Sequence, residues 1–257
     1  MPPRRVISLC PSITETLVEI GARDRLVAAT RYCTRPNGVL RGLPRIGGTK
    51  DPDVGRILEL APDLVFVNEE ENRRQDVEAL RSAGVAVDVS FPRRVADVPS
   101  DVRRWGALVG GEPAGEAARL AASIESGLAA LCDAPARAFR YVYWIWRDPW
   151  MTVSDDTYVA DLLSLAGGTN VFGSESARYP VTTPEDARRR RPEAHLFPDE
   201  PYAFREARHA SEMSELFGRA ARLLFVAGDD CCWHGFRTLA GLEAMRELRE
   251  RLAPPVQ

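Results

Sequence analysis

Short apolar runs alternate with amphipathic stretches along the chain. In the first half, the runs typical of buried strands occupy residues 6–9, 26–29, 64–67 and 85–89. Stretches with helical spacing follow them, and we predict helices over residues 12–20, 53–60, 71–82 and 98–109. This alternation predicts a parallel or mixed sheet with helices on both faces.

Local signals predict where two of these helices begin. Ser12 followed by Glu15 matches a capping box, so we expect Ser12 to be the N-cap of the first helix. Asp53 is the expected cap of the second helix, and Pro62 follows its end.

A long helical pattern lies in the middle of the chain. Pro113 suits a first helical turn, and apolar residues continue at helical spacing as far as Leu131. Such a helix would measure about 30 Å. Its place between two strand–helix series favours a spine that joins two lobes over an ordinary helix within one lobe.

The second half repeats the plan without repeating the sequence. We predict strands over residues 139–144, 195–197 and 223–226 and helices over residues 159–165, 186–191 and 238–252. The fold class is therefore α/β, with two Rossmann-like lobes of mostly parallel sheets joined by one long helix. The expected parts are an N-terminal lobe, a backbone helix and a C-terminal lobe, over residues 1–111, 112–134 and 135–257.

Composition excludes several classes of partner. The 257 residues carry a net charge of −3, which argues against nucleic acid or an anionic membrane surface. The chain contains no apolar run near the ~20 residues needed to insert into a bilayer. The first residues lack the pattern of a secretory signal, so we expect a cytoplasmic protein, with a periplasmic location as the alternative if the start is trimmed. We expect a monomer.

Catalytic and metal-binding motifs are weak. The odd cysteine count of five indicates no disulfide framework, and nucleophile-elbow, Walker and dinucleotide-binding patterns do not occur. Cys10 lies at a helix start, where a thiolate would be stabilised, but the sequence names no base beside it. A single histidine could serve as axial ligand to a metal held in a macrocycle, but we expect no protein-only metal site. The histidines are His195, His209 and His234.

Aromatic residues follow the predicted strands, at the edge where open α/β sheets bind ligands. Trp144, Trp146 and Trp150 fall within seven residues, and Trp233 lies in a later loop. Exposed aromatic rings suit a large, flat, partly apolar ligand. Alternation along the strand places Trp144 and Trp146 on one side, so burial of one or both in the core is the alternative.

Three segments carry a resemblance to a known family. They are residues 5–15 (RVISLCPSITE), residues 58–65 (LELAPDLV) and residues 162–172, which end in AGGTNVF. In this order, around a central helix, they resemble the helical-backbone metal receptor superfamily. This is the class of ABC-transporter substrate-binding proteins that includes the vitamin B12 and ferric-siderophore binding proteins.

The resemblance implies two lobes, a rigid interlobe helix and a shallow cleft that holds the ligand between aromatic side chains. By position, Tyr32 resembles the first-lobe aromatic, and Trp150 or Met151 the second-lobe counterpart. Residues 230–237 resemble the late loop that reaches the polar edge of the ligand. The expected ligand-binding residues are Pro11, Ser12, Tyr32, Trp150, Met151, Tyr202, Asp230, Trp233, His234 and Arg237.

The resemblance also implies an acidic residue on each lobe that docks on a permease. Glu185 resembles the second-lobe acid. The matching first-lobe position is Gly55, with Asp51 and Asp53 nearby. This departure from the pattern weighs against delivery to a transporter.

We therefore expect a non-catalytic protein that binds cobalamin or another metal chelate as a small, non-covalent ligand. The first alternative is an ABC-transporter receptor for haem or a ferric siderophore, an anionic chelate that loop arginines would pair with. Those arginines are Arg31, Arg35, Arg147, Arg205 and Arg237. The second alternative is an enzyme that uses Cys10 or the Cys231–Cys232 pair in thiol chemistry.

Overall fold

The computed structural model describes residues 1–252, which divide into two compact units. Unit 1 contains residues 1–92, 96–126 and 234–238, and unit 2 contains residues 93–95, 127–233 and the described residues from 239 on. The chain thus returns to unit 1 for five residues, His234–Thr238, which we call the return segment.

Unit 1 is built on a parallel sheet with the strand order β2-β1-β3-β4. The strands are β1 (Val6–Ser8), β2 (Leu26–Ala29), β3 (Leu64–Asn68) and β4 (Ala86–Ser90). The helices are α1 (Pro11–Glu19), α2 (Val54–Glu59), α3 (Arg74–Ser82) and α4 (Val98–Val109), with short 3-10 turns at η1 (Arg23–Arg25), η2 (Val95–Asp97) and η3 (Gly235–Arg237).

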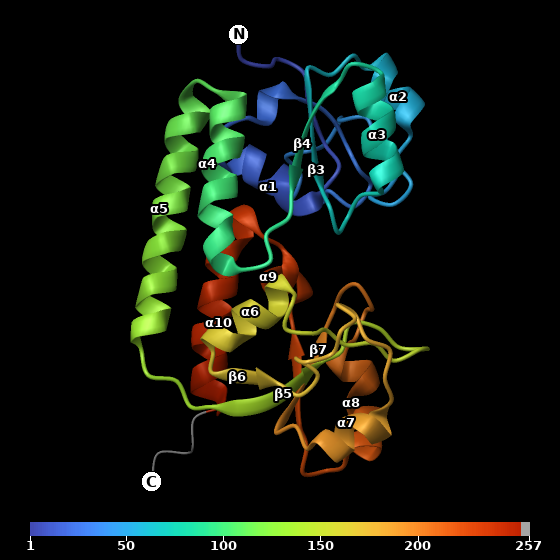
Figure 1. The fold of residues 1–257 in the computed structure, drawn as a ribbon, viewed down its shortest axis with the longest axis vertical. Coiled ribbons are helices and arrows are strands. Elements are labelled where there is room, and N and C mark those ends of the chain that lie inside the picture. The colour runs from blue at the N-terminus through green and yellow to red at the C-terminus, as the bar shows by residue number, and fades with distance from the viewer. Residues whose placement is uncertain (253–257) are drawn as a thin grey trace. The chain divides into compact units, whose positions relative to one another are not determined.

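Both faces of this sheet are covered. The helices α2 and α3 lie on one side of β3 and β4, and α1 and α4 lie on the other (Figure 1). Every residue of β3 is buried, as expected of a continuous apolar strand between two helical layers. The core under α2 and α3 contains Ile7, Leu9, Ile57, Val65, Val67 and Leu80.

The predicted long mid-chain helix is present as α5 (Glu112–Asp133), which has 22 residues. It begins one residue before Pro113 and ends two residues beyond Leu131, and neither Gly115 nor Gly127 interrupts it. Its residues up to 126 belong to unit 1 and those from 127 belong to unit 2.

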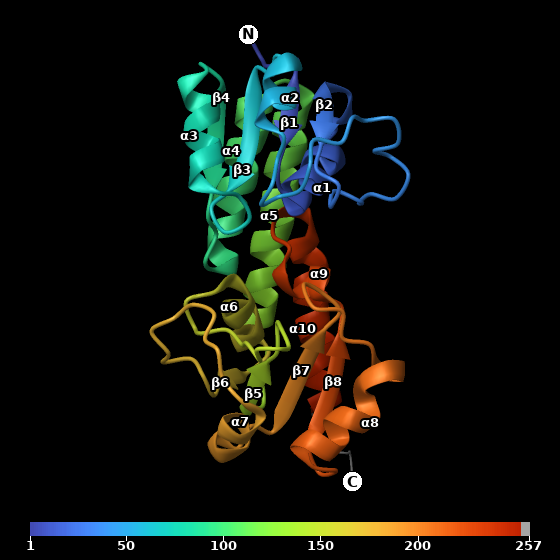
Figure 2. The same ribbon diagram turned by 90° about the vertical axis from the view of Figure 1, so that its right-hand side faces the viewer.

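Unit 2 repeats the topology of unit 1 with a parallel sheet in the order β6-β5-β7-β8. The strands are β5 (Phe139–Tyr143), β6 (Gly168–Asn170), β7 (Ala194–Pro198) and β8 (Arg222–Val226). The helices are α6 (Tyr158–Leu165), α7 (Pro184–Arg190), α8 (Glu206–Phe217), α9 (Gly228–Cys232) and α10 (Thr238–Leu252). Figure 2 shows α8 and α10 on opposite sides of β7 and β8.

The structure confirms the predicted class of two α/β lobes with parallel sheets. The bounds of β2, α4 and α10 agree with the predictions. The prediction of Ser12 as N-cap of α1 was wrong: Cys10 holds that position, and no side chain caps the helix. Glu15 does not close a capping box, because it pairs with a distant arginine. The sequence reading also missed β6, α8 and α9.

None of the helices within residues 1–252 combines the length and the apolar character needed to cross a membrane.

Candidate ligand-binding site

Parallel sheets with this strand order have a natural ligand-binding edge. In each unit the first and third strands are neighbours, and the loops after them lead to helices on the two faces of the sheet. Ligands of open α/β sheets bind at this carboxyl edge, where the strand order reverses. The side chains that follow β1 and β3 in unit 1 and those that follow β5 and β7 in unit 2 are therefore the candidate ligand contacts.

The carboxyl edge of unit 1 is closed by a buried polar network centred on the return segment. The Nε2 atom of His234 lies 3.2 Å from Asn68 Nδ2 and 3.4 Å from Ser12 Oγ. Asn72 accepts a hydrogen bond from Asn68 N at 2.8 Å. Its side-chain amide donates to Leu9 O at 3.1 Å and to Thr49 O at 3.0 Å. The network therefore ties together the loops that follow β1 and β3.

His234 lies at the centre of this network. Its side chain is buried beside the ring of Trp105, with the ring centroids 5.8 Å apart. Desolvation lowers the pKa of His234 to about 4, so the imidazole is neutral at neutral pH. Pro11 and Ser12 are also buried, so the structure places these three predicted contact residues beneath the surface of unit 1.

The return segment is held by a second buried interaction. The Nε atom of Arg237 lies 3.2 Å from Glu15 Oε2, and both side chains are largely withdrawn from solvent. Phe236 N donates to Thr16 Oγ1 at 2.9 Å. Gly235 has φ +81°, and a Cβ at this position would lie 2.1 Å from Thr16 Oγ1. The predicted ligand contact of Arg237 is therefore engaged within unit 1.

Tyr32 is the predicted unit 1 contact that does reach solvent. It lies in the loop after β2, and 51% of its surface is exposed. Arg31 stacks over its ring at 5.0 Å and forms an ion pair with Asp51 at 2.9 Å. The phenol ring thus has one side available at the carboxyl edge of unit 1.

In unit 2, the tryptophans after β5 divide between core and surface. Trp144 is fully buried and meets Trp150 edge-to-face, with ring centroids 4.9 Å apart. Trp150 also packs against Phe204 and Phe217 and is only partly exposed. Trp146, by contrast, is 40% exposed. Trp144 and Trp146, which were predicted to lie on the same side of one strand, therefore differ in burial. Strand alternation does not apply to them, because β5 ends at Tyr143 and both tryptophans lie beyond it.

Trp146 belongs to an exposed apolar surface that sequence reasoning only partly found. Its ring lies 5.7 Å from Tyr202, and its backbone bridges Met151, which in turn bridges Val181. Val181 is 64% exposed, and Tyr179, two residues before it, is 38% exposed. We call these five residues the aromatic face; its members are Trp146, Met151, Tyr179, Val181 and Tyr202.

Residues 230–237, the late loop predicted to reach the ligand, are divided between the two units. Asp230 lies in α9 and Trp233 is the C-cap residue of that helix, both in unit 2, whereas His234 and Arg237 belong to unit 1. Near them, burial and the neighbouring Asp229 raise the pKa of Glu200, and the thiol of Cys232 donates to its carboxylate at 3.7 Å.

The structure opposes the expectation of a stabilised thiolate at Cys10. Burial raises the pKa of the Cys10 thiol to about 12, which outweighs its place at the start of α1. Burial has the same effect on Cys231. Within residues 1–252, side chains of His, Cys, Asp and Glu form no group of three suited to a metal ion.

The three histidines are all buried, which disfavours each of them as an axial ligand. Burial lowers the pKa of His195 to about 4, and Trp144 Nε1 lies 3.3 Å from its Nδ1 atom. His209 accepts a hydrogen bond from Arg205 N at 2.8 Å.

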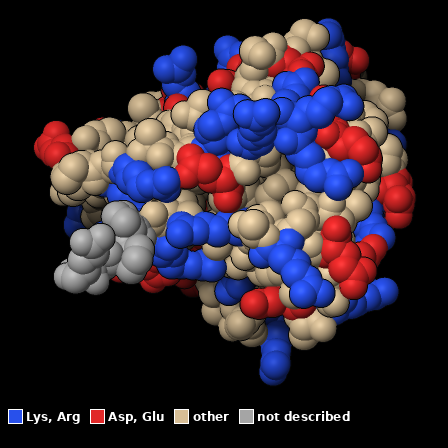
Figure 3. All heavy atoms as spheres, turned by 90° about the horizontal axis from the view of Figure 1, so that it is seen from below, with Lys and Arg blue, Asp and Glu red and all other residues tan. Residues whose placement is uncertain are grey.

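The two positions predicted for transporter docking lie on α7 in unit 2 and on α2 in unit 1. Each of these helices follows the second strand of its unit in chain order. Glu185 is in the first turn of α7, exposed, and paired with Arg188 at 3.1 Å. Gly55 lies in α2, where Asp53 caps the helix by accepting from Arg56 N. Figure 3 shows basic and acidic side chains close together over one face of the molecule, which agrees with such local pairs.

Comparison with known proteins places the chain in a family. The periplasmic binding protein family matches residues 6–205, so the chain belongs to it. The vitamin B12-binding protein of Yersinia pestis (strain Pestoides F) is 30% identical over 192 residues, covering 74% of this chain and 67% of that protein.

Solved structures show the same fold. The periplasmic vitamin B12 binding protein BtuF of Vibrio cholerae matches with a TM-score of 0.83 and 21% identity, over 97% of this chain and 98% of that one. The periplasmic heme-binding protein RhuT from Roseiflexus sp. RS-1 matches with a TM-score of 0.82 and 21% identity, over 96% and 98%.

These comparisons confirm the family resemblance seen in the sequence. Members of this family are substrate-binding proteins and not enzymes. The relatives are described as periplasmic, so the expectation of a cytoplasmic protein is not supported, whereas the periplasmic alternative agrees with them.

Proposed function

We propose that this chain is a non-catalytic binding protein for a corrinoid of the cobalamin type. The observation that carries the proposal is the aromatic face of unit 2, together with the half-exposed ring of Tyr32 in unit 1. Exposed rings at ligand-binding edges suit a large, flat and partly apolar molecule. The curated relative named for vitamin B12 supports the same ligand class.

The charges near these loops favour a corrinoid over an anionic siderophore. Four of the five loop arginines expected to pair with an anionic chelate already pair with carboxylates of their own unit. The pairs are Arg31–Asp51, Arg147–Glu212, Arg205–Asp199 and Arg237–Glu15. Binding an anionic chelate through these arginines would first require the existing ion pairs to break.

The burial of the histidines disfavours a haem that is held by histidine. Haem iron in proteins is held by an axial side chain, commonly histidine. All three histidines are buried in the described structure. A corrinoid whose cobalt already carries two axial ligands needs only surface contacts from the protein.

Titration of the purified protein with cyanocobalamin and, separately, with haemin tests this proposal. We expect calorimetry to detect tight cyanocobalamin binding, and Trp146→Ala and Tyr32→Ala to weaken it at least about tenfold each, since a stacked aromatic contributes about 0.5–1.5 kcal/mol beyond its buried area. Leu108→Ala, which truncates an exposed side chain on α4, serves as the control. Absence of binding at micromolar concentrations would refute the proposal.

We also propose that the protein works outside the cytoplasm, as its periplasmic relatives do. Glu185 is the proposed docking acid of unit 2, and unit 1 offers Gly55 at the matching position, with Asp51 and Asp53 nearby and engaged. Cell fractionation tests the location. Glu185→Gln should leave cyanocobalamin affinity unchanged while lowering any transporter-dependent uptake, and a loss of affinity would contradict the docking role.

A further inference from the structure

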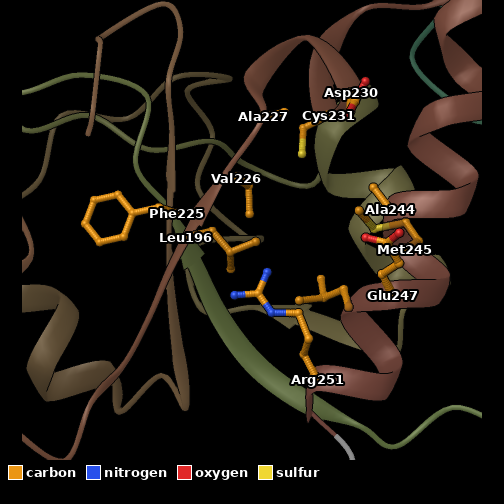
Figure 4. A pocket seen from close by; sticks show the side chains of 11 residues that line it. Leu196, Phe225, Val226, Ala227, Asp230, Cys231, Ala244, Met245, Glu247 and Arg251 are labelled. Carbon is orange, nitrogen blue, oxygen red and sulfur yellow. The ribbon is translucent and has the colours of Figure 1, made fainter. Parts of the chain in front are cut away.

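Unit 2 contains a small cavity away from the aromatic face. Its volume is about 180 Å³, and it lies between the sheet at β7 and β8 and the helices α9 and α10 (Figure 4). Its lining includes Leu196, Val226, Ala244, Met245, Glu247 and Arg251.

The inner walls of the cavity are apolar. Leu196, Met245 and Leu248 are buried, and the sulfur of Cys231 is directed into the same space (Figure 4). Because the Cys231 thiol is buried and its pKa is about 12, it adds no charge to this wall. An apolar cavity of about 150 Å³ accommodates a benzene ring, so this one suits a molecule of similar or slightly larger size.

The rim of the cavity carries one positive and one negative side chain. Glu247 and Arg251 lie one turn apart on α10, a spacing and order that usually gives an ion pair. Within residues 1–252, no ion pair of 4.0 Å or less joins them, and Figure 4 shows their charged groups on different sides of the cavity. The carboxylate of Asp230 points away from the space.

We propose that this cavity is a second ligand site, for a small zwitterion such as an α-amino acid with a short branched apolar side chain. The carboxylate of the ligand pairs with Arg251, its ammonium group pairs with Glu247, and its side chain packs on Leu196 and Val226. A simple anion would meet Glu247 and a simple cation would meet Arg251, so a molecule with both charges matches the rim best.

The four methionines provide a direct test, because two of them report on different sites. Met245 lines the cavity and Met151 belongs to the aromatic face. In a spectrum of the full chain with ¹³C-labelled methionine methyls, L-valine should shift the Met245 signal and leave Met151 in place. Cyanocobalamin should shift Met151 and leave Met245 in place, so failure of one proposal is distinguishable from failure of the other.

Variants then test the contacts. Arg251→Gln and Glu247→Gln should each weaken L-valine binding at least about tenfold, because each removes a charged partner. Arg246→Gln is the control, since it removes an exposed arginine of the same helix that pairs with Glu243. Isovalerate and isobutylamine, which carry one charge each, should bind at least about tenfold more weakly than L-valine.

Two outcomes would overturn the proposal. One is an unmoved Met245 signal at tens of millimolar L-valine. The other is a shift of the same size in Arg251→Gln, Glu247→Gln and the wild-type protein, which would show that valine acts without these charges. Ala244→Leu, which fills the cavity, should abolish the shift, while the unchanged dispersion of the Met151 and Met213 signals verifies that the variant is folded.

Discussion

Replacing Arg237 with alanine should strongly destabilise unit 1. The substitution removes the partner of Glu15, whose side chain is only 4% exposed, while that of Arg237 is 15% exposed. The carboxylate would remain buried in α1 without its counter-charge, because water cannot readily reach that position. Desolvation of an unpaired charge is among the largest single costs in a folded protein.

The structure permits a magnitude and a matched control. Breaking a buried ion pair by removing one partner costs about 3–5 kcal/mol, compared with a total stability of about 5–15 kcal/mol for a domain. Arg246 and Glu243 form a pair of the same residue types on α10, with side chains 61% and 52% exposed. Arg246→Ala should cost at most about 1 kcal/mol, because exposed pairs contribute little.

The assay is urea unfolding, supplemented by hydrogen exchange of the α1 amides, which reports unit 1 separately from unit 2. The double variant Glu15→Leu with Arg237→Met should recover most of the lost stability, because an apolar pair leaves no buried charge. The reasoning is refuted if Arg237→Ala loses no more stability than Arg246→Ala, or if the double variant is as unstable as the single one.

Three further predictions concern backbone, pH and thiols. Gly235→Ala should cost about 2–4 kcal/mol through overpacking and a left-handed backbone, whereas Gly218→Ala, with φ +95° and no atom within 4 Å of the new methyl, should cost about 1–2 kcal/mol; equal losses in urea unfolding would contradict this. The pKa of His234 is about 4 in the folded chain and 6.5 as the reference value, so the unfolded chain takes up this proton first as the pH falls. Its contribution to stability is complete above pH 6.5 and decreases toward pH 4, and His234→Gln should show a smaller loss of urea midpoint over that range than the wild type. A thiol reagent at pH 7.5 should label two sites in the folded protein and five after unfolding, as counted by mass spectrometry; labelling of a third site in the folded state would contradict the burial of the others. The exposed sites are Cys132 and Cys232.

Local patterns predicted most of the strands and helices. The apolar run at residues 64–67 indicates a strand buried on both faces, and β3 is such a strand. The helix α8 was missed because its buried side chains are only His209, Met213 and Phe217, at every fourth position, in an otherwise polar segment. A pattern with so few apolar residues resembles a loop when the sheet they pack against is unknown.

The site was less predictable than the fold. Tyr32, Met151 and Tyr202 lie at exposed or partly exposed positions, as a ligand contact requires. Trp146 was not among the expected ligand contacts, although its indole is more exposed than that of Trp150. The prediction that Trp144 and Trp146 share one side depended on strand alternation through both residues. Because β5 ends at Tyr143, this alternation does not reach either tryptophan.

The sequence by itself determined the alternation of strands and helices, the parallel character of the sheets and the family. These properties follow from hydrophobic periodicity and short motifs, which are read within a few residues of one another. Only the tertiary structure decided which polar side chains are available. Arg237 and Glu15 are separated by 222 positions, and His234 meets Asn68 across 166. Whether a charge or an imidazole faces ligand or is buried against a partner depends on such distant contacts, because burial belongs to the packed chain and not to any local segment.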